Sequence, residues 1–153
     1  MNKPATPPKS QARSAARLAA VQALYQQQME KTALARLLNE FHQHRLGQEI
    51  EDEQYADAEV DFFDDIVSGV DARREEIDEL LQSKLAQGWK IDRLDKTMVQ
   101  ILRCGTYELL ARADVSKKVV ISEYIDVAHA FFDDKEAKFV NGVLDSVAKA
   151  VRP

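Results

Sequence analysis

Apolar side chains in this sequence recur at intervals of three and four residues, and this spacing constrains the fold more than any other feature. The interval places side chains on one face of a helix, whereas a half-buried strand requires alternation at every second position. Short polar segments and a few glycines and prolines separate the periodic stretches. The pattern predicts seven helices, over residues 11–29, 32–47, 57–71, 77–88, 95–112, 117–132 and 133–151.

Composition agrees with a helical chain that has one or two small cores. Of the 153 residues 45% are hydrophobic, which is typical of globular proteins. Five Gly and four Pro are too few for a sandwich or barrel that turns about every ten residues. A chain of this length can bury one compact core or two small helical bundles that share a face. The predicted fold class is therefore all-α.

Local signals mark several helix ends. Side chains that can accept hydrogen bonds from free backbone N–H groups stand before the periodic stretches, at Ser10 or Ser14, Thr32, Ser116, and Asp133 or Asp134, and Asp95 precedes the fifth stretch. Glu136 is placed for a capping box with Asp133. The β-branched run at 119–121 favours a strand by propensity alone. The cap at Ser116 and the helical spacing that follows it favour a helix instead.

Three further features concern the connections and the interior. The acidic stretch 48–56 is predicted to be a loop. Gly69 is expected to be a weak point inside the third helix, because glycine lowers helix stability. Trp89 carries a large ring between the fourth and fifth helices, and we expect it to plug the junction there.

Several classes of protein are excluded. No stretch approaches the roughly 18 consecutive apolar residues of a membrane span, and the first twenty residues lack the apolar centre of a secretory signal. We therefore expect a cytoplasmic protein. The single cysteine, Cys104, rules out an intrachain disulfide and a zinc-binding cysteine cluster, and we expect its thiol to be buried.

Catalytic motifs are missing from the sequence. It contains no glycine-rich phosphate loop, no G-x-S-x-G elbow and no H-E-x-x-H pair. His42 and His44 lie two residues apart on a predicted helix, so they point to different sides and cannot readily share a metal. The carboxylates between 49 and 65 lack the spacing of a calcium-binding loop. We expect no enzymatic activity, no metal and no cofactor.

Charge is distributed unevenly along the chain. Residues 46–72 hold ten carboxylates and no Lys or Arg, so a chain with a net charge of −5 is positive by five elsewhere. Residues 1–17 hold four cations and no acid, at Lys3, Lys9, Arg13 and Arg17. A short basic arm of this kind is typical of phosphate contact, although an ordinary solvated tail can have the same composition.

Four segments, in order along some 130 residues, resemble the NusB family. They are residues 13–25 (RSAARLAAVQALY), 101–109 (ILRCGTYEL), 118–123 (KVVISE) and 138–145 (KFVNGVLD). Ser122 stands where an Asn is common in the family, and Ser14, Ala15 and Ala16 separate two arginines where relatives often have a denser cluster. Because NusB proteins bind RNA, the wider spacing of the arginines implies a weaker intrinsic affinity for RNA than in relatives with the denser cluster.

The resemblance implies a fold and an activity. NusB proteins are all-helical and built as two bundles, so we expect two packed sub-bundles, with residues 1–10 as a flexible basic arm and 11–153 as one RNA-binding domain. They bind the boxA element of nascent RNA together with NusE, a protein of the small ribosomal subunit. That complex joins the elongating RNA polymerase and suppresses premature termination, especially on ribosomal RNA operons. A homodimer is a further possibility.

The resemblance also implies residue roles. The candidate RNA-binding residues are Arg13, Arg17, Gln22, Arg103, Lys135, Lys138, Phe139 and Asn141. Single-stranded RNA needs cations for its phosphates, which Arg13 and Arg17 can supply, and flat side chains for its bases, which Phe139 can supply. Tyr25 is the candidate contact for the protein partner. Alternatives remain open, since Phe139, Asn141 and Gly142 can serve helix packing and Arg103 can form a structural ion pair.

Two rival functions are compatible with parts of the sequence. A NusB-like domain also begins some ribosomal RNA cytosine methyltransferases, but this sequence contains no strand-rich cofactor domain and no catalytic Cys motif. A purely protein-binding adaptor would instead use the acidic helix 57–71 as its contact. Salt-dependent binding of RNA would distinguish the adaptor from the RNA-binding protein.

Overall fold

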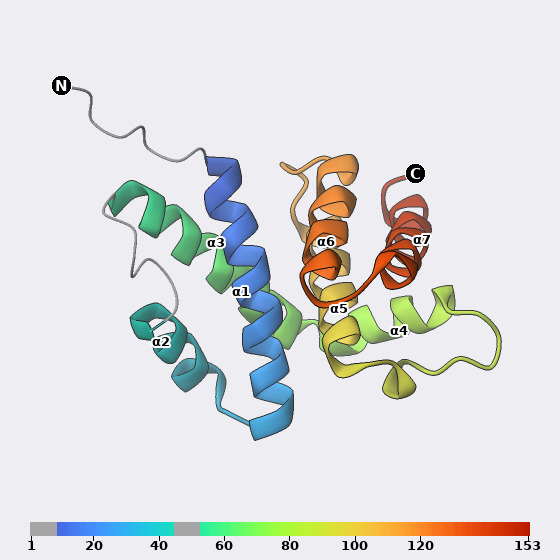
Figure 1. Ribbon diagram of the computed structural model, residues 1–153, viewed down its shortest axis with the longest axis horizontal. Helices are drawn as coiled ribbons and strands as arrows, with labels where there is room; N and C mark the ends of the chain where they lie inside the picture. Colours follow the sequence, from blue (N-terminus) through green and yellow to red (C-terminus); the bar gives the residue numbers. More distant parts are fainter. Residues whose placement is uncertain (1–8, 45–52) are drawn as a thin grey trace. The chain divides into compact units, whose positions relative to one another are not determined.

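The computed structural model describes residues 9–44 and 53–153, and these fold into seven α-helices without a strand (Figure 1). The predicted all-α fold class is confirmed. The helices are α1 (Lys9–Glu30), α2 (Leu34–His44), α3 (Glu53–Ala72), α4 (Arg74–Lys84), α5 (Lys96–Ala111), α6 (Lys117–Phe131) and α7 (Asp134–Val151). A single 3-10 turn, η1 (Ile91–Arg93), lies between α4 and α5.

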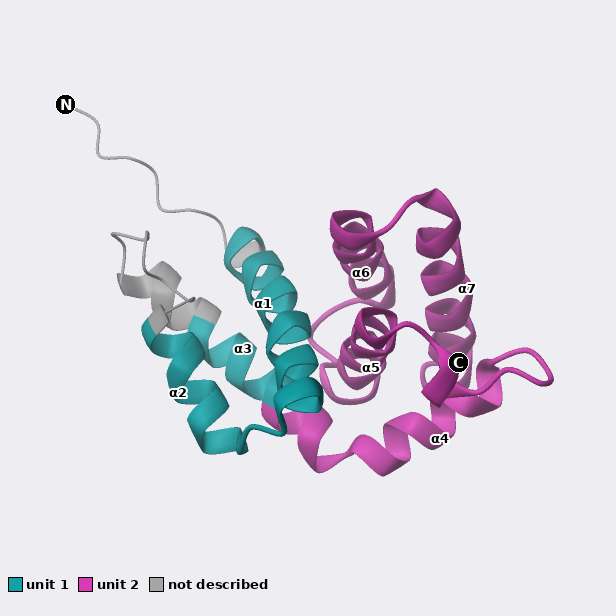
Figure 2. Ribbon diagram, turned by 60° about the horizontal axis from the view of Figure 1, so that its bottom comes forward, with its two compact units in different colours: residues 1–67 teal, residues 68–153 magenta. Residues whose placement is uncertain are grey.

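The chain divides into two compact units, residues 1–67 and residues 68–153, and the boundary falls inside α3 (Figure 2). In the first unit, α1 packs on α2. The buried positions of α1 are mostly alanines, which allow neighbouring helices to come close, as at Ala12, Ala16 and Ala20. The rings of Phe41 and Phe63 stack in the core of this unit with their centroids 5.4 Å apart.

In the second unit, α5 lies at the centre and contacts α4, α6 and α7. Nearly all of its residues from Met98 to Leu109 are buried, as expected for a helix that has neighbours on several sides. A polar contact lies within this core, because the hydroxyl of Tyr124 on α6 donates a hydrogen bond to the fully buried carboxylate of Glu108 on α5. A buried polar pair of this kind is stable when both groups are satisfied.

Ser116 forms its predicted cap, and Asp95 caps α5. The Asp95 carboxylate accepts hydrogen bonds from the backbone N–H groups of Thr97 and Met98, at 2.8 and 3.1 Å. The Ser116 hydroxyl accepts one from Val119 at 3.2 Å. The β-branched run after Ser116 is helical, so the cap and the spacing outweigh local strand propensity there.

Other predicted ends differ from the structure. The first helix begins at Lys9, which places Ser10 and Ser14 inside it, and the second begins after Ala33 and not after Thr32. Residues 53–56 are helical rather than part of a loop. The predicted end near Gly47 and residues 48–52 lie outside the described residues.

Two further expectations concern Asp133 and Gly69, and the first is wrong. Asp133 is the N-cap residue of α7, but its side chain accepts no hydrogen bond, so no capping box forms there. For Gly69, which is expected to lower the stability of the third helix, the structure shows a packing role as well. A Cβ atom at this position would overlap the ring of Tyr107, so the absence of a side chain lets α3 and α5 pack closely.

Candidate nucleic-acid interface

The two arginines of the α1 motif lie over one aromatic ring. The guanidinium carbons of Arg13 and Arg17 are 4.6 and 4.9 Å from the centroid of the Phe62 ring. This geometry is a cation–π contact from two successive helix turns. Arg17 is only 1% exposed, whereas Arg13 is half-buried. Arg17 therefore supports the interior of the first unit, and of the pair Arg13 is the one that reaches the surface.

Farther along α1, Gln22 and Tyr25 lie on an exposed face. Tyr25 is 39% exposed and Met29, one turn later, is 52% exposed. Gln26, between them, donates a hydrogen bond of 2.9 Å to Glu40 on α2, which fastens the two helices together. The amphipathic ring of Tyr25 is thus accessible to a partner, as its candidate role requires.

Arg103 forms an ion pair inside the second unit. Its Nε and Nη2 atoms each donate a hydrogen bond of 2.8 Å to the carboxylate of Asp78 on α4. The Arg103 side chain is 12% exposed and that of Asp78 is 27% exposed. A bidentate pair with little exposure joins α4 to α5, which is the structural alternative considered for this residue.

The candidates on α7 lie at its accessible side. Lys135, Lys138 and Asn141 are exposed, and Phe139 is half-buried. Lys135 and Phe139 are four residues apart and so share one face of the helix. The Phe139 ring stacks on that of Trp89, with the centroids 6.0 Å apart and the planes inclined by 29°. Phe139 is therefore neither fully buried in the core nor without a neighbouring ring.

Trp89 is not among the candidate site residues that the sequence indicates, but the structure brings it against one of them. It is 53% exposed, so it does not plug the junction between helices as expected. The chain turns at Gly88, which has a left-handed backbone with φ of +88°, and the indole then lies against Phe139 at the surface. The useful sequence signal was a lone Trp directly after a glycine, which suits a ring presented from a turn.

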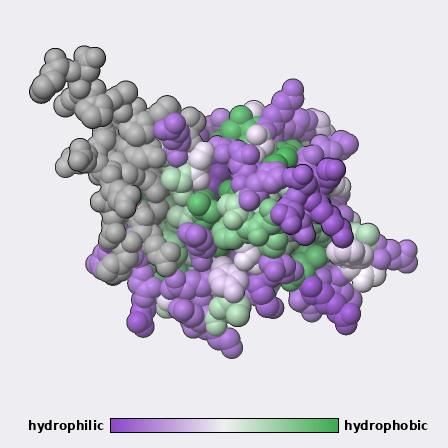
Figure 3. Space-filling view, viewed as in Figure 1, coloured by the Kyte–Doolittle hydropathy of each residue, from purple (hydrophilic) through white to green (hydrophobic). Residues whose placement is uncertain are grey.

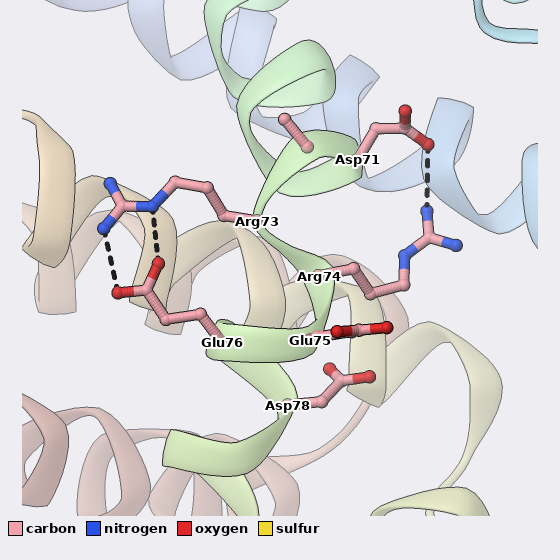
Figure 4. A pocket seen from close by; sticks show the side chains of 7 residues that line it. Asp71, Arg73, Arg74, Glu75, Glu76 and Asp78 are labelled. Carbon is pink, nitrogen blue, oxygen red and sulfur yellow. Dashed lines mark hydrogen bonds and ion pairs between the residues drawn. The ribbon is translucent and has the colours of Figure 1, made fainter.

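An open pocket lies where α3 gives way to α4, in the second unit (Figure 4). Four of its six charged side chains form two pairs: Arg73 donates to Glu76 at 2.8 and 3.1 Å, and Arg74 lies 3.4 Å from Asp71. The hydrogen bond from Arg73 lowers the pKa of the Glu76 carboxyl. No three potential metal ligands converge anywhere in the described part of the chain. The pocket is thus a junction between α3 and α4 that is held largely by ion-paired side chains.

The coloured part of the face shown in Figure 3 is largely hydrophilic at its edges, with hydrophobic areas between. Among described residues, the exposed large hydrophobic side chains are Tyr25, Met29, Trp89, Val119 and Phe131. No described helix is long and apolar enough to cross a lipid bilayer. Exposed aromatic and cationic side chains on a helical scaffold are the features of a helical binding protein.

Comparison with known proteins identifies the family. The NusB family model matches residues 14–149, and the chain belongs to this family of non-enzymatic transcription antitermination factors. The transcription antitermination protein NusB of Novosphingobium aromaticivorans is 70% identical over 141 residues, which cover 92% of this chain and 95% of that protein. The Sphingopyxis alaskensis protein of the same name is 62% identical, over 94% and 97% of the two chains.

Solved structures show the same fold. NusB from T. maritima superposes with a TM-score of 0.78 at 30% identity, covering 100% of this chain and 96% of that one. A structure described as antitermination factors NusB and NusE in complex with dsRNA gives a TM-score of 0.77 at 26% identity, covering 92% and 98%. The resemblance deduced from the four motifs is confirmed.

Proposed function

We propose that this chain binds boxA-type single-stranded RNA of ribosomal RNA operons together with NusE, and that the complex joins the elongating RNA polymerase to keep transcription processive. The observation that carries the proposal is the α7 motif, where a half-exposed Phe139 lies among exposed cations in a protein of the NusB family. A related structure that contains NusB, NusE and RNA supports both partners. The proposed place of action is the cytoplasm.

Residue roles follow from exposure. Arg13, Lys135 and Lys138 are accessible cations for phosphates, and Phe139 offers part of its ring to a base. Gln22 and Asn141 are exposed amides that can donate to and accept from base edges.

Three other candidates have supporting or separate roles. Arg17 holds Phe62 beneath Arg13, and Arg103 holds α4 against α5 through Asp78. Tyr25 is the proposed contact for NusE, because its ring is exposed on α1. We further propose that residues 11–153 act as one RNA-binding domain, preceded by the basic arm 1–10.

A titration of labelled RNA tests the proposal. A boxA-type RNA and an RNA of the same bases in scrambled order are titrated with the chain, each with and without NusE. We expect tighter binding of the boxA-type RNA and a further gain when NusE is present. Equal affinity for both RNAs would remove boxA specificity. Binding of NusE without any RNA binding would favour the protein-binding adaptor.

A further inference from the structure

Two hydrogen bonds hold the loop that carries Trp89. One lies on each side of Lys90, the next residue along the chain. Gln82, in the last turns of α4, donates from Nε2 to the Trp89 carbonyl at 2.7 Å. Its Oε1 atom accepts from the Ile91 N–H at 3.0 Å. The Trp89 N–H also donates to the Ala86 carbonyl at 3.0 Å, which closes the turn. One amide side chain thus fixes the backbone that presents the indole.

The indole is supported on one side and open on the other. The Phe139 ring stacks on the indole with the two ring centroids 6.0 Å apart, while 53% of Trp89 remains exposed. A Cβ built on Gly142, one turn beyond Phe139 on α7, would meet nothing within 4 Å. The helix surface beside the two rings is therefore unobstructed by a side chain at that position.

Positive charge accompanies the ring pair. Lys90 follows Trp89 directly, and Lys135 lies one turn before Phe139 on the same face of α7. Both are exposed, as is Lys138. Among the described residues, no other large hydrophobic side chain is exposed on α4, α7 or the loop from 85 to 95. An isolated flat ring among cations suits a nucleobase and its phosphate better than the apolar centre of a protein interface.

We propose that Trp89 is a stacking residue for an unpaired RNA base, with the base on the open face of the indole, and that Gln82 is the residue that positions it. The proposal rests on the proposed RNA-binding function and adds a residue to its surface. The base would extend the stack formed by Trp89 and Phe139, and a phosphate would lie near Lys90 or Lys135. The fixed loop means that little conformational entropy is lost on binding.

The chain contains a single Trp, so fluorescence excited at a wavelength that tyrosine does not absorb reports on Trp89 alone. We would titrate the protein with a short single-stranded boxA-type RNA and follow the emission of Trp89, with the anisotropy of labelled RNA measured in parallel. Stacking should quench the emission along the same binding curve as the anisotropy. The same RNA presented as a duplex should quench it much less, because paired bases are not available for stacking. When NusE is added, any Trp in it is first replaced by Phe.

Variants then separate stacking from other roles. Trp89→Ala should weaken RNA binding by about tenfold, and Trp89→Phe should restore most of the loss, because a smaller ring still stacks. Val119→Ala, which removes an exposed apolar side chain from α6, should leave the affinity unchanged. Gln82→Ala should lower RNA affinity and the fluorescence anisotropy of Trp89 together, with urea unfolding unchanged.

Each failure has a distinct meaning. If labelled RNA binds but Trp89 emission and the affinity of Trp89→Ala do not change, the stacking proposal is wrong and the proposed function stands. If Trp89→Ala weakens NusE binding and leaves RNA affinity unchanged, the ring is a protein contact. If Gln82→Ala binds RNA as the parent does, Gln82 does not position the site. No anisotropy change with any RNA, with or without NusE, would overturn the proposed function itself.

Discussion

At the scale of single residues, Arg152 shows how one side chain can donate hydrogen bonds to the carbonyl groups at the end of a helix. Its guanidinium donates hydrogen bonds of 2.6 to 3.0 Å to four backbone carbonyls, those of Glu108, Leu109, Arg112 and Val115. The last carbonyls of a helix have no partner within it, and a cation there also faces the negative end of the helix dipole. Arg152 therefore fastens the end of α7 to the end of α5.

Arg152→Ala should lower the free energy of unfolding by about 2–4 kcal/mol, because several charge-assisted hydrogen bonds to partly buried carbonyls are lost. Arg152→Lys should recover only part of this, since a point charge cannot reach four acceptors in a planar fork. Urea unfolding followed by circular dichroism measures both. Arg93→Ala, at an exposed site, is the matched control and should change stability by less than about 0.5 kcal/mol. A similar small effect at Arg152 would mean that water replaces the guanidinium.

The Cys104 thiol should be inert in the folded protein. It is fully buried, and burial raises its pKa well above the ordinary value, so the reactive thiolate is scarce at neutral and mildly alkaline pH. A colorimetric disulfide reagent should react with it at a rate limited by unfolding, and at once in strong urea. Rapid reaction of the native protein would show that α5 opens locally far more often than its buried position predicts.

Arg17 and Arg103 show the limit of sequence at this scale. A sequence identifies a cation in a motif, but not the neighbour that it meets in space. Phe62 and Asp78 lie 45 and 25 residues away along the chain, and only the folded chain brings them against these arginines. The exposed lysines of α7 were easier to predict, because helical spacing alone separates its accessible side from its buried one.

At the scale of elements, all seven helices were predictable, since apolar spacing is a local property. The ends of the helices were less predictable from the sequence. Asp95 and Ser116 act as caps because each stands directly before a helix, whereas Asp133 has the same position and forms no side-chain hydrogen bond. The loop with Trp89 depends on a bond from Gln82, seven residues earlier, and no periodic pattern indicates such a contact.

Gly142→Ala should separate helix stability from function. Gly142 is exposed within α7, and nothing lies within 4 Å of the added methyl group. The substitution should raise the free energy of unfolding by about 0.5–1 kcal/mol, because alanine is the better helix former. If RNA approaches this bare surface closely, the same methyl group should weaken RNA binding.

Gly69→Ala is the matched control for that change. Its methyl group would overlap the ring of Tyr107, so we expect it to destabilise the fold by about 1–3 kcal/mol. Urea unfolding and RNA titration are measured on both variants. A more stable Gly142→Ala that binds RNA with unchanged affinity would show that RNA does not reach this part of α7.

At the scale of the whole molecule, the sequence was sufficient to predict an all-α protein of two helical units. It did not predict that the division falls within α3, because a helix that passes from one unit to the next has the same periodicity throughout. The uneven charge was also visible in the sequence. Ten carboxylates lie within residues 46–72, so the cations that remain elsewhere must serve any contact with phosphate.

The basic segment before and at the start of α1 should contribute to the salt dependence of RNA binding. Arg17 is buried, so Lys3, Lys9 and Arg13 remain as the candidate phosphate contacts among the cations of the first seventeen residues. Each phosphate contact on a single strand adds about 0.7 to the slope of log K against log salt. A Lys3→Ala, Lys9→Ala double variant should therefore flatten the slope by about 1.4 and weaken binding most at low salt.

The matched control removes two exposed lysines from the first turn of α6, as Lys117→Ala with Lys118→Ala, and so makes the same change in net charge. If only overall charge matters, both double variants should weaken RNA binding equally and with equal change in slope. If the N-terminal lysines contact phosphates, only their removal should flatten the slope by the predicted amount. Parent-like slopes in both variants would exclude the arm as a contact and leave Arg13 and the α7 lysines to bind the RNA backbone.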